Sequence, residues 1–132
     1  MSFDLSRSNG WVLHAVALAA GDRAAPLEAV VAAGDASNHA VFNPAELSAC
    51  LGRLLSAGLV VREGEGYAPA VEVRARLNRG GLARQRDEAE RLVERGGVNS
   101  LPVSDAAPSE AASEHAVESY LRLAAPSAGR AV

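Results

Sequence analysis

Lysine and isoleucine are absent from this chain, and cysteine and aromatic residues are scarce. All 13 basic residues are therefore arginine, and aromatic residues make up 4% of the 132 positions. Cys50 is the single cysteine, which excludes an internal disulfide and fits a reducing cytoplasm. With so few aromatic residues, the core must be built largely from small side chains, and the many alanines favour helices.

Excess positive charge and long apolar runs are absent as well. The formal net charge is -3, so no overall positive field draws the protein to DNA or to anionic membranes. The apolar run WVLHAVALAA, residues 11–20, is too short to cross a bilayer and lacks the flanks of a signal peptide. We expect a cytoplasmic protein without membrane contact, large enough to bury one modest core.

Two helices are predicted in the first third of the chain. The first spans residues 9–20, with Ser8 as its N-cap and a glycine as its terminator. It is apolar on nearly all sides, so it must be covered on two sides, by later segments or by a second subunit. A homodimer is the simplest way to supply the second side, and we expect one. The stretch GDRAAP leaves room for one very short strand. The second helix begins near Pro26 and is expected to continue through GDASNHA, although Gly34 offers a point where it breaks.

The third helix carries the clearest local signals. Asn43 is a good N-cap, Pro44 fits the first helical position, and Glu46 stands where a capping-box acid belongs. Phe42 and Leu47 occupy the two positions of a hydrophobic staple. One apolar face follows, made of Leu47, Cys50, Leu51, Leu54 and Leu55, until Gly58 ends the helix.

A β-hairpin and an arginine-rich region come next. LVVR and GYAPAVEV flank the turn EGEG, and Pro69 places the second strand at an edge or ends its regular pairing. Residues 74–86 hold five arginines and no acid, and ARQRDEAERLVER predicts a helix with acid–base pairs at turn spacing. From about Asn99, the Ser, Ala and Pro content indicates a mobile tail with room for a short helix in SEHAVESYLRLA.

The sequence therefore predicts a mainly α fold with a small β-hairpin, a C-terminal helix and a flexible tail. The stretch AELSACLGRLLSAGLVVREGEGYAPA resembles the third helix and wing of many bacterial winged helix-turn-helix regulators. GDASNHAVFNPAELSACLGRLLSAGLV is also similar to small bacterial winged-helix proteins whose function is not settled. The expected parts are a winged-helix domain (1–75), an Arg-rich C-terminal helix (76–98) and an Ala/Ser/Pro-rich tail (99–132).

The resemblance implies that residues 43–57 form a recognition helix and that residues 62–67 form the wing tip. Base reading needs forked donors or acceptors, and on the outward face of this helix only Arg53 is a strong base reader. That face consists of Ala45, Ser48, Ala49, Gly52, Arg53 and Ser56. The wing places two acids beside Arg62, which is unfavourable against a phosphate backbone. A small, neutral face of this kind is equally suited to packing against a protein.

Arginines after the wing are the better candidates for phosphate contact. Arg74, Arg76 and Arg79 are expected to lack an acidic partner, because residues 74–86 contain no acid. Arg84, Arg86 and Arg91 are expected to pair with the acids at positions 87, 88 and 90. The predicted nucleic-acid-binding residues are Arg53, Ser48, Arg62, Arg74, Arg76 and Arg79.

No catalytic or metal-binding pattern stands out. Asp35, Asn38 and His39 offer too few ligands for a metal site, and we expect them to cap backbone groups and fix the turn. Cys50 lies on the apolar helix face, where a thiol is usually inert. There is no nucleophile–base pair, phosphate-binding glycine loop or carboxylate dyad at a meaningful spacing. We therefore expect no enzyme activity, no cofactor and no bound metal.

Two functions remain open. The first is a transcriptional regulator that makes weak or partner-assisted contact with double-stranded DNA. The alternative is a winged-helix module that binds a protein partner on its third-helix face and does not bind DNA.

Overall fold

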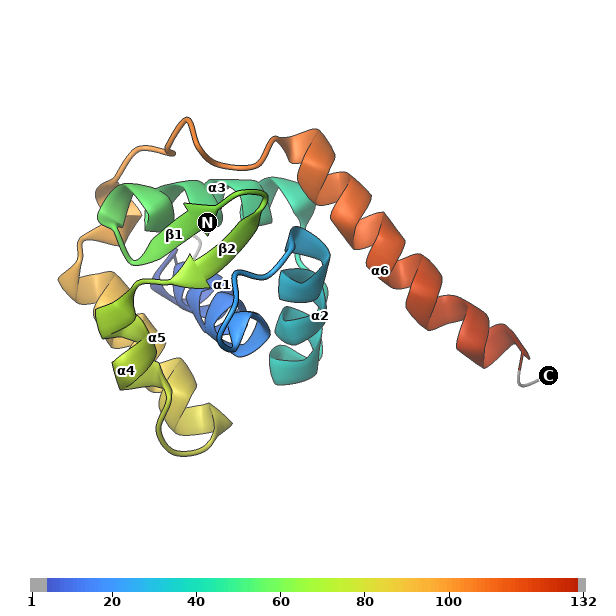
Figure 1. The fold of residues 1–132 in the computed structure, drawn as a ribbon, viewed down its shortest axis with the longest axis horizontal. Helices are drawn as coiled ribbons and strands as arrows, with labels where there is room; N and C mark the ends of the chain where they lie inside the picture. The colour runs from blue at the N-terminus through green and yellow to red at the C-terminus, as the bar shows by residue number, and fades with distance from the viewer. Residues whose placement is uncertain (1–4, 131–132) are drawn as a thin grey trace.

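The computed structural model describes residues 5–130 as a mainly helical fold with a small β-hairpin, as the sequence predicts (Figure 1). The elements in chain order are α1 (Leu5–Ala20), α2 (Leu27–Asn38), α3 (Pro44–Ala57), β1 (Val60–Glu63), β2 (Gly66–Pro69), α4 (Val71–Leu77), α5 (Leu82–Arg95), the 3-10 helix η1 (Val98–Ser100) and α6 (Glu110–Arg130).

Helix α1 is the centre of the fold. It packs against α2, α3 and α5, and also contacts β2, α4 and η1. Val12, Leu13 and Val16 are fully buried among these elements. The chain itself thus covers the helix that is apolar on nearly all sides, so the predicted homodimer loses the argument on which it was based.

The start of α1 corrects one prediction. The helix begins at Leu5 and not at Asn9, so Ser8 lies inside it and is not its N-cap. The Ser8 hydroxyl donates instead to Oε2 of Glu46 at 3.0 Å, a contact between α1 and the first turn of α3. This long-range hydrogen bond outweighs the local capping preference of serine. Gly21, with φ 52°, follows the helix in the left-handed conformation expected of a terminator.

Helix α2 continues through Gly34 to Asn38, as predicted. Gly34 is buried, and a Cβ at this position would clash with the Phe42 ring. The Trp11 indole N–H donates to the Gly34 carbonyl at 3.1 Å, and the Trp11 and Phe42 ring centroids lie 4.0 Å apart. Gly34 therefore serves close packing and does not mark the end of a helix.

The N-terminus of α3 forms largely as its sequence predicts. The Asn43 side chain accepts from the backbone N–H groups of Ala45 at 2.9 Å and Glu46 at 3.3 Å, and Pro44 is the first helical residue. Phe42 and Leu47 are both buried in the core. Gly58 follows the last turn with φ 75°.

The hairpin is shorter than expected. β1 and β2 are antiparallel, with Val60 opposite Pro69, and β2 ends there. The following residues, predicted to extend the strand, form α4 instead, because proline has no N–H to continue the ladder. The very short strand expected before α2 is the bridge between Ala25 and Tyr67, whose backbone groups exchange two hydrogen bonds of 2.8 Å.

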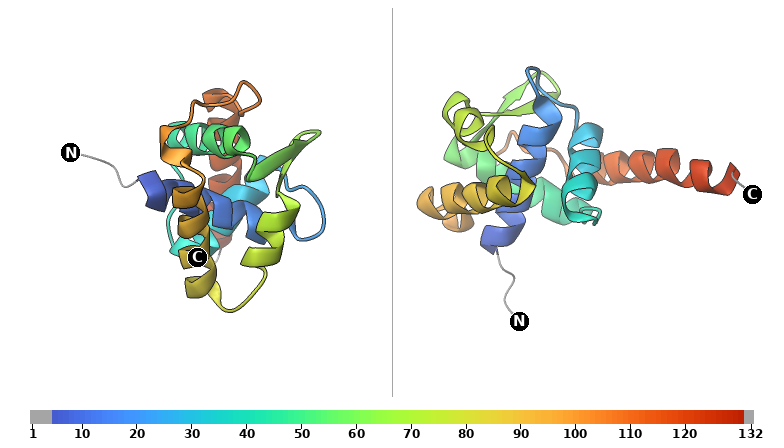
Figure 2. Two further views of the ribbon diagram at one scale, coloured as in Figure 1. Left: turned by 90° about the vertical axis from the view of Figure 1, so that its left-hand side faces the viewer. Right: turned by 90° about the horizontal axis from the view of Figure 1, so that it is seen from below.

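The C-terminal third packs back on the domain. Residues 101–109, predicted as part of a mobile tail, run along α3, and α6 has 21 residues where a short helix was expected (Figures 1 and 2). α6 contacts α2 and α3, and its far half projects away from the body (Figure 1). The boundary expected at residue 75 falls inside α4, and the single helix expected over 76–98 is divided between α4, α5 and η1.

Candidate functional site

The outward side of α3 is covered by the chain's own C-terminal residues. Three positions spaced by four residues, Ser48, Gly52 and Ser56, form one stripe, here called the outer stripe. Ser56 Oγ donates to the Pro102 carbonyl at 2.8 Å, and the Gly52 carbonyl accepts from the Ser104 N–H at 3.1 Å. Residues 101–109, here called the C-terminal segment, therefore run antiparallel to α3 along its length.

The first position of the stripe is buried under α6. Ser48 Oγ lies 2.6 Å from Ser113 Oγ and donates to the Ser109 carbonyl at 3.1 Å. Ser48 is 9% exposed and Ser113 is fully buried. Ser48, predicted to face nucleic acid, is therefore occupied by the protein itself.

Gly52 allows the segment to approach closely. A Cβ at this position would collide with Cγ1 of Val103 and would lie 3.0 Å from Cβ of Ala107. Any side chain on residue 52 would push the segment away from α3.

The wing arginine also holds this segment. Arg62 Nη1 donates to the Ala106 carbonyl at 2.8 Å, and its Nε donates to the Gly64 carbonyl at 3.1 Å. Its guanidinium carbon lies 5.6 Å from the centre of the Tyr67 ring. Burial raises the pKa of Tyr67, and the nearby Arg62 lowers it in part.

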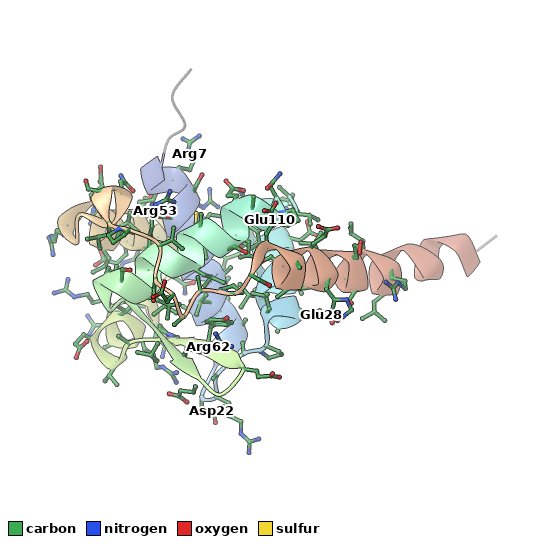
Figure 3. All side chains as sticks on the ribbon, turned by 90° about the horizontal axis from the view of Figure 1, so that it is seen from above. Arg7, Asp22, Glu28, Arg53, Arg62 and Glu110 are labelled. Atoms are coloured by element: carbon green, nitrogen blue, oxygen red, sulfur yellow. The ribbon has the colours of Figure 1, made fainter. Side chains whose placement is uncertain are left out.

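Arg53 and Arg62 face different sides of α3. In Figure 3, Arg53 lies on the side where α1 begins, whereas Arg62 lies on the hairpin side. Arg53 shares a hollow of about 410 Å³ with Ser8, Glu46 and Cys50. A carboxylate in the same hollow opposes the attraction of Arg53 for a phosphate.

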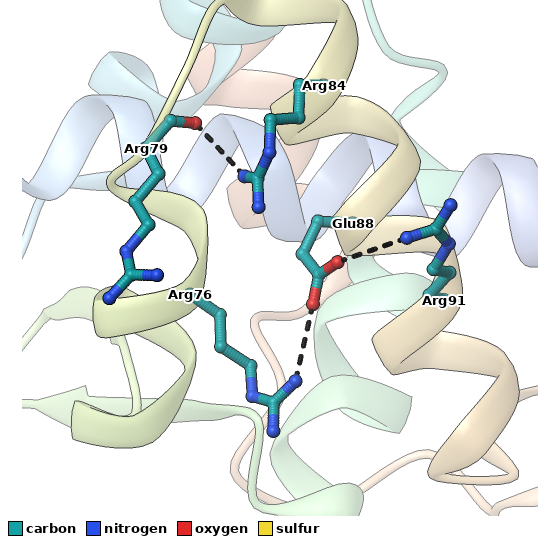
Figure 4. Close-up of polar contacts among 5 residues, drawn as sticks. All are labelled: Arg76, Arg79, Arg84, Glu88 and Arg91. Atoms are coloured by element: carbon teal, nitrogen blue, oxygen red, sulfur yellow. Dashed lines mark hydrogen bonds and ion pairs between the residues drawn. The ribbon is translucent and has the colours of Figure 1, made fainter.

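Arginines of α4 and α5 form a second group (Figure 4). Arg76 Nη1 lies 3.5 Å from one oxygen of Glu88, Arg91 Nη1 lies 3.7 Å from the other, and Arg84 Nη1 donates to the Arg79 carbonyl at 3.3 Å. A hollow of about 360 Å³, here called the arginine hollow, is lined by Ala75, Arg76, Arg79, Arg84 and Glu88.

The positive charge of this region stands out against the acidic chain. Residues 74–95 contain seven arginines and four acids, an excess of three positive charges in a chain of formal net charge -3. Both contacts of Glu88 are longer than the ~2.7–2.9 Å of a charge-assisted hydrogen bond. Arg76 is 54% exposed on its side chain, so it keeps donors for another anion.

The structure separates the predicted site residues into two places. Arg53, Arg62 and Ser48 lie at α3 and the hairpin, where the C-terminal segment runs. Arg76 in α4 and Arg79 in the turn between α4 and α5 line the arginine hollow, and in Figure 1 this turn lies on the far side of the hairpin from α3. Arg74 lines a different hollow, of about 320 Å³, with Leu18 and Asp22 among its neighbours.

Two pairings differ from the sequence expectations. Arg76 was expected to have no acid nearby, but the turn at Gly80 and Gly81 brings α5 back so that Glu88 reaches it. Arg84 was expected to pair with acids of its own helix, yet it lines the arginine hollow beside Arg79.

The polar cluster before α3 has a different role from the one predicted. The Asp35 carboxylate accepts from the Tyr120 hydroxyl at 2.5 Å and thereby ties α6 to α2. This hydrogen bond raises the pKa of Tyr120. The backbone carbonyl of Asp35, and not its side chain, accepts the capping N–H of His39. Asn38 and His39 are exposed, and residues 5–130 contain no group of His, Cys, Asp and Glu that could hold a metal.

Sequence reasoning missed Ser113 and the particular contacts that Gly52 and Tyr120 make. Their contacts bridge distant parts of the chain, and local composition does not reveal them. The one available signal was the outer stripe itself, because small residues repeated every four positions indicate close approach on a helix.

The buried titratable groups serve structure. His14 is 1% exposed, and its Nε2 lies 3.0 Å from Oε1 of Gln85 on α5. Burial lowers the pKa of His14, the hydrogen bond to Gln85 raises it, and Arg86 lowers it. Burial raises the pKa of the Cys50 thiol to about 12, so this thiol stays protonated.

Comparisons with family models, with curated proteins and with solved structures gave no match to the chain. Within residues 5–130, no helix has both the length and the apolar content needed to cross a membrane.

Proposed function

We propose that this protein is a winged-helix regulator that makes weak contact with double-stranded DNA, chiefly through arginine–phosphate contacts. The observation that carries the proposal is the arginine hollow, which is lined by Arg76, Arg79 and Arg84. Glu88 lines the same hollow, and its carboxylate contacts Arg76 and Arg91. A phosphate oxygen accepts from guanidinium N–H groups in the same way as that carboxylate does.

The order of elements supports the winged-helix part of the proposal. A helix, a short pairing segment at Ala25, two helices and a hairpin follow one another, and Ala25 pairs with the second strand of the hairpin. This is the order that the resemblance implies. Fold alone does not assign a function, so the proposal depends on the arginines.

Weak, sequence-tolerant contact is what this chemistry supports. The outer stripe of α3 is occupied and Arg53 shares its hollow with Glu46, so few groups are available to read bases. Arginine contacts to phosphate position a protein on DNA without reading its sequence. Such a role belongs in the cytoplasm, and a DNA-bound partner protein would supply the missing specificity.

The test is a fluorescence-anisotropy titration of the full chain with random-sequence duplexes at several salt concentrations. Replacing Arg76, Arg79 and Arg84 together with Gln should weaken binding to every duplex. It should also flatten the dependence of log affinity on log salt by up to ~3, because each phosphate contact contributes ~0.9 to the slope. Replacing Glu88 with Gln should strengthen binding.

The matched control replaces Arg23, Arg95 and Arg122 with Gln, which makes the same change in net charge outside the arginine hollow. This control should leave most of the affinity intact. Equal losses of duplex affinity in both triple variants would mean that net charge alone explains the effect. No binding at micromolar protein and low salt would contradict the proposal.

A second candidate function is a protein-interaction module. The observation that favours it is that the outer stripe of α3 already holds a peptide segment through hydrogen bonds to backbone carbonyls. If no duplex binds, this function takes precedence.

A further inference from the structure

The C-terminal residues occupy the two elements that the winged-helix resemblance would place against DNA, the outer stripe of α3 and the wing. Residues 101–113, here called the cover, lie on the outer stripe of α3, and the wing arginine Arg62 donates to Ala106 within it. In Figure 3 the loop part of the cover passes over α3 before α6 begins at Glu110. No duplex can reach the outer stripe while the cover is in place.

The contacts of the cover suit release more than permanent packing. Towards α3 they are mainly hydrogen bonds, from the serines of the outer stripe and from the Ser104 N–H. Pro108 is the one buried residue among residues 101–109, and Val103 remains 46% exposed although it lies against Gly52. The anchored part is the start of α6, where Ala116 and Val117 are buried and Tyr120 bonds to Asp35. Segments with few buried apolar contacts open at lower free energy than the core.

We propose that the cover is an autoinhibitory segment, which closes the α3 face and restricts duplex binding until it is displaced. The inference rests on the proposed function, because it assigns regulation to the same DNA contact. Displacement frees the outer stripe and releases Arg62 from Ala106 in one step. The closed form then binds only through the arginine hollow, and the open form adds the α3 face and the wing.

Gly52 provides a way to open the cover without weakening α3. Gly52→Ala adds a methyl group where Cγ1 of Val103 lies, while alanine favours the helix over glycine. Adding Val103→Ala removes the closest collision and leaves contacts of 3.0 and 3.1 Å to the Cβ atoms of Ala107 and residue 103, which a small shift relieves. The cover should then close again. The double variant is therefore the matched control for Gly52→Ala.

Opening is measured without DNA through a thiol at residue 113. Ser113 is the last residue of the cover and is fully buried against Ser48, so a Ser113→Cys thiol reacts with a maleimide reagent only after opening. Cys50 is 2% exposed and its pKa is about 12, so its own labelling is slow. We expect Gly52→Ala to raise the fraction of molecules with an open cover by about tenfold. Labelling of the Ser113→Cys protein should become faster by the same factor. Val103→Ala should reverse the gain.

Duplex affinity should follow the same order. In the full chain, Gly52→Ala should tighten duplex binding by up to about tenfold, because apparent affinity scales with the competent fraction. Arg62→Gln in the Gly52→Ala background should remove this gain, whereas the hollow variant of Arg76, Arg79 and Arg84 should remove the binding of the closed form.

A disulfide that holds the cover closed should lower duplex affinity while leaving the rest of the α3 face unchanged. The hydroxyls of Ser48 and Ser113 are 2.6 Å apart, so S48C/S113C should form a disulfide across the closed cover. The oxidised protein should bind duplex more weakly than the same protein after reduction.

The outcomes separate the two proposals. Faster labelling with tighter binding, both reversed by Val103→Ala, supports the cover. Unchanged labelling, or faster labelling with unchanged affinity in a protein that binds duplex, overturns it. No duplex binding by any variant contradicts the proposed function, and a labelling rate that Gly52→Ala leaves unchanged would then overturn the cover as well.

Discussion

The two faces of α3 differ in how they are held. The inner face presents Leu47, Leu51 and Leu54, which are all fully buried. The outer stripe presents two serines and a glycine, which contact the cover through four hydrogen bonds, two of them at Ser48. Burial of a leucine side chain contributes ~1.5–3 kcal/mol, whereas a hydrogen bond contributes ~0.5–1.5 kcal/mol net.

This difference separates stability from control on one helix. The inner face cannot move without disrupting the core around α1, so changes there should affect the whole fold. The outer stripe can part from the cover while the core stays intact, so changes there should affect only local opening.

The largest effect is expected on the inner face. Leu51→Ala should lower the free energy of unfolding by ~2–5 kcal/mol, because it leaves a cavity in a packed core. Urea denaturation measures the change. Leu121→Ala is the control, since Leu121 is 46% exposed and its removal should cost little. A loss below ~1 kcal/mol at Leu51 would break the contrast between the two faces.

The cap of α3 should have the next largest effect. Asn43→Ala removes the oxygen that accepts from Ala45 and Glu46, and should cost ~1 kcal/mol. Asn38→Ala, which replaces an exposed asparagine at the end of α2, is the control. Equal thermal stability of the Asn43 variant and the wild type would contradict the capping role.

His14 should make the core sensitive to acid. Burial lowers the pKa of His14 in the folded state, so the unfolded chain takes up its proton more readily. The contribution of His14 is therefore present above its unfolded pKa of ~6.5 and is lost as the pH falls below it. Urea denaturation from neutral pH to pH ~5.5 should show a decline that His14→Gln reduces. His39→Gln, at an exposed histidine, should leave the decline unchanged.

The smallest global effect is expected on the outer stripe. Ser56→Ala removes one exposed hydrogen bond to Pro102 and should change the free energy of unfolding by ~0.5 kcal/mol at most. It should nevertheless speed hydrogen exchange in the cover. Ser100→Ala, at an exposed serine before the cover, is the control. A global loss as large as that of Leu51→Ala would mean that cover and core are one unit.

Local signals predicted the elements whose ends are set by a few adjacent residues. The cap at Asn43, the stop at Gly58 and the hairpin turn followed from residue types in sequence order. The strand expected beyond Pro69 was wrong because its alternating pattern also fits the single helical side that α4 buries with Val73 and Leu77. Here tertiary packing decided between two readings of one short pattern.

Contacts between distant residues could not be predicted in this way. The Ser48–Ser113 and Asp35–Tyr120 contacts join positions 65 and 85 residues apart, and the tail that supplies one partner has the composition of a linker. Arg76 meets Glu88 only because the intervening glycines turn the chain back. The sequence therefore predicted the inner face of α3 but not the cover on its outer stripe.

Native-state hydrogen exchange on the unaltered protein tests the central claim most directly. The Ser104 amide, which donates to the Gly52 carbonyl, reports on the cover, and the amides in the middle of α1 report on the core. The Ser104 amide should exchange through a local opening at least ~2 kcal/mol below global unfolding, with little dependence on denaturant. Exchange of Ser104 at the same free energy and denaturant dependence as α1 would contradict a releasable cover.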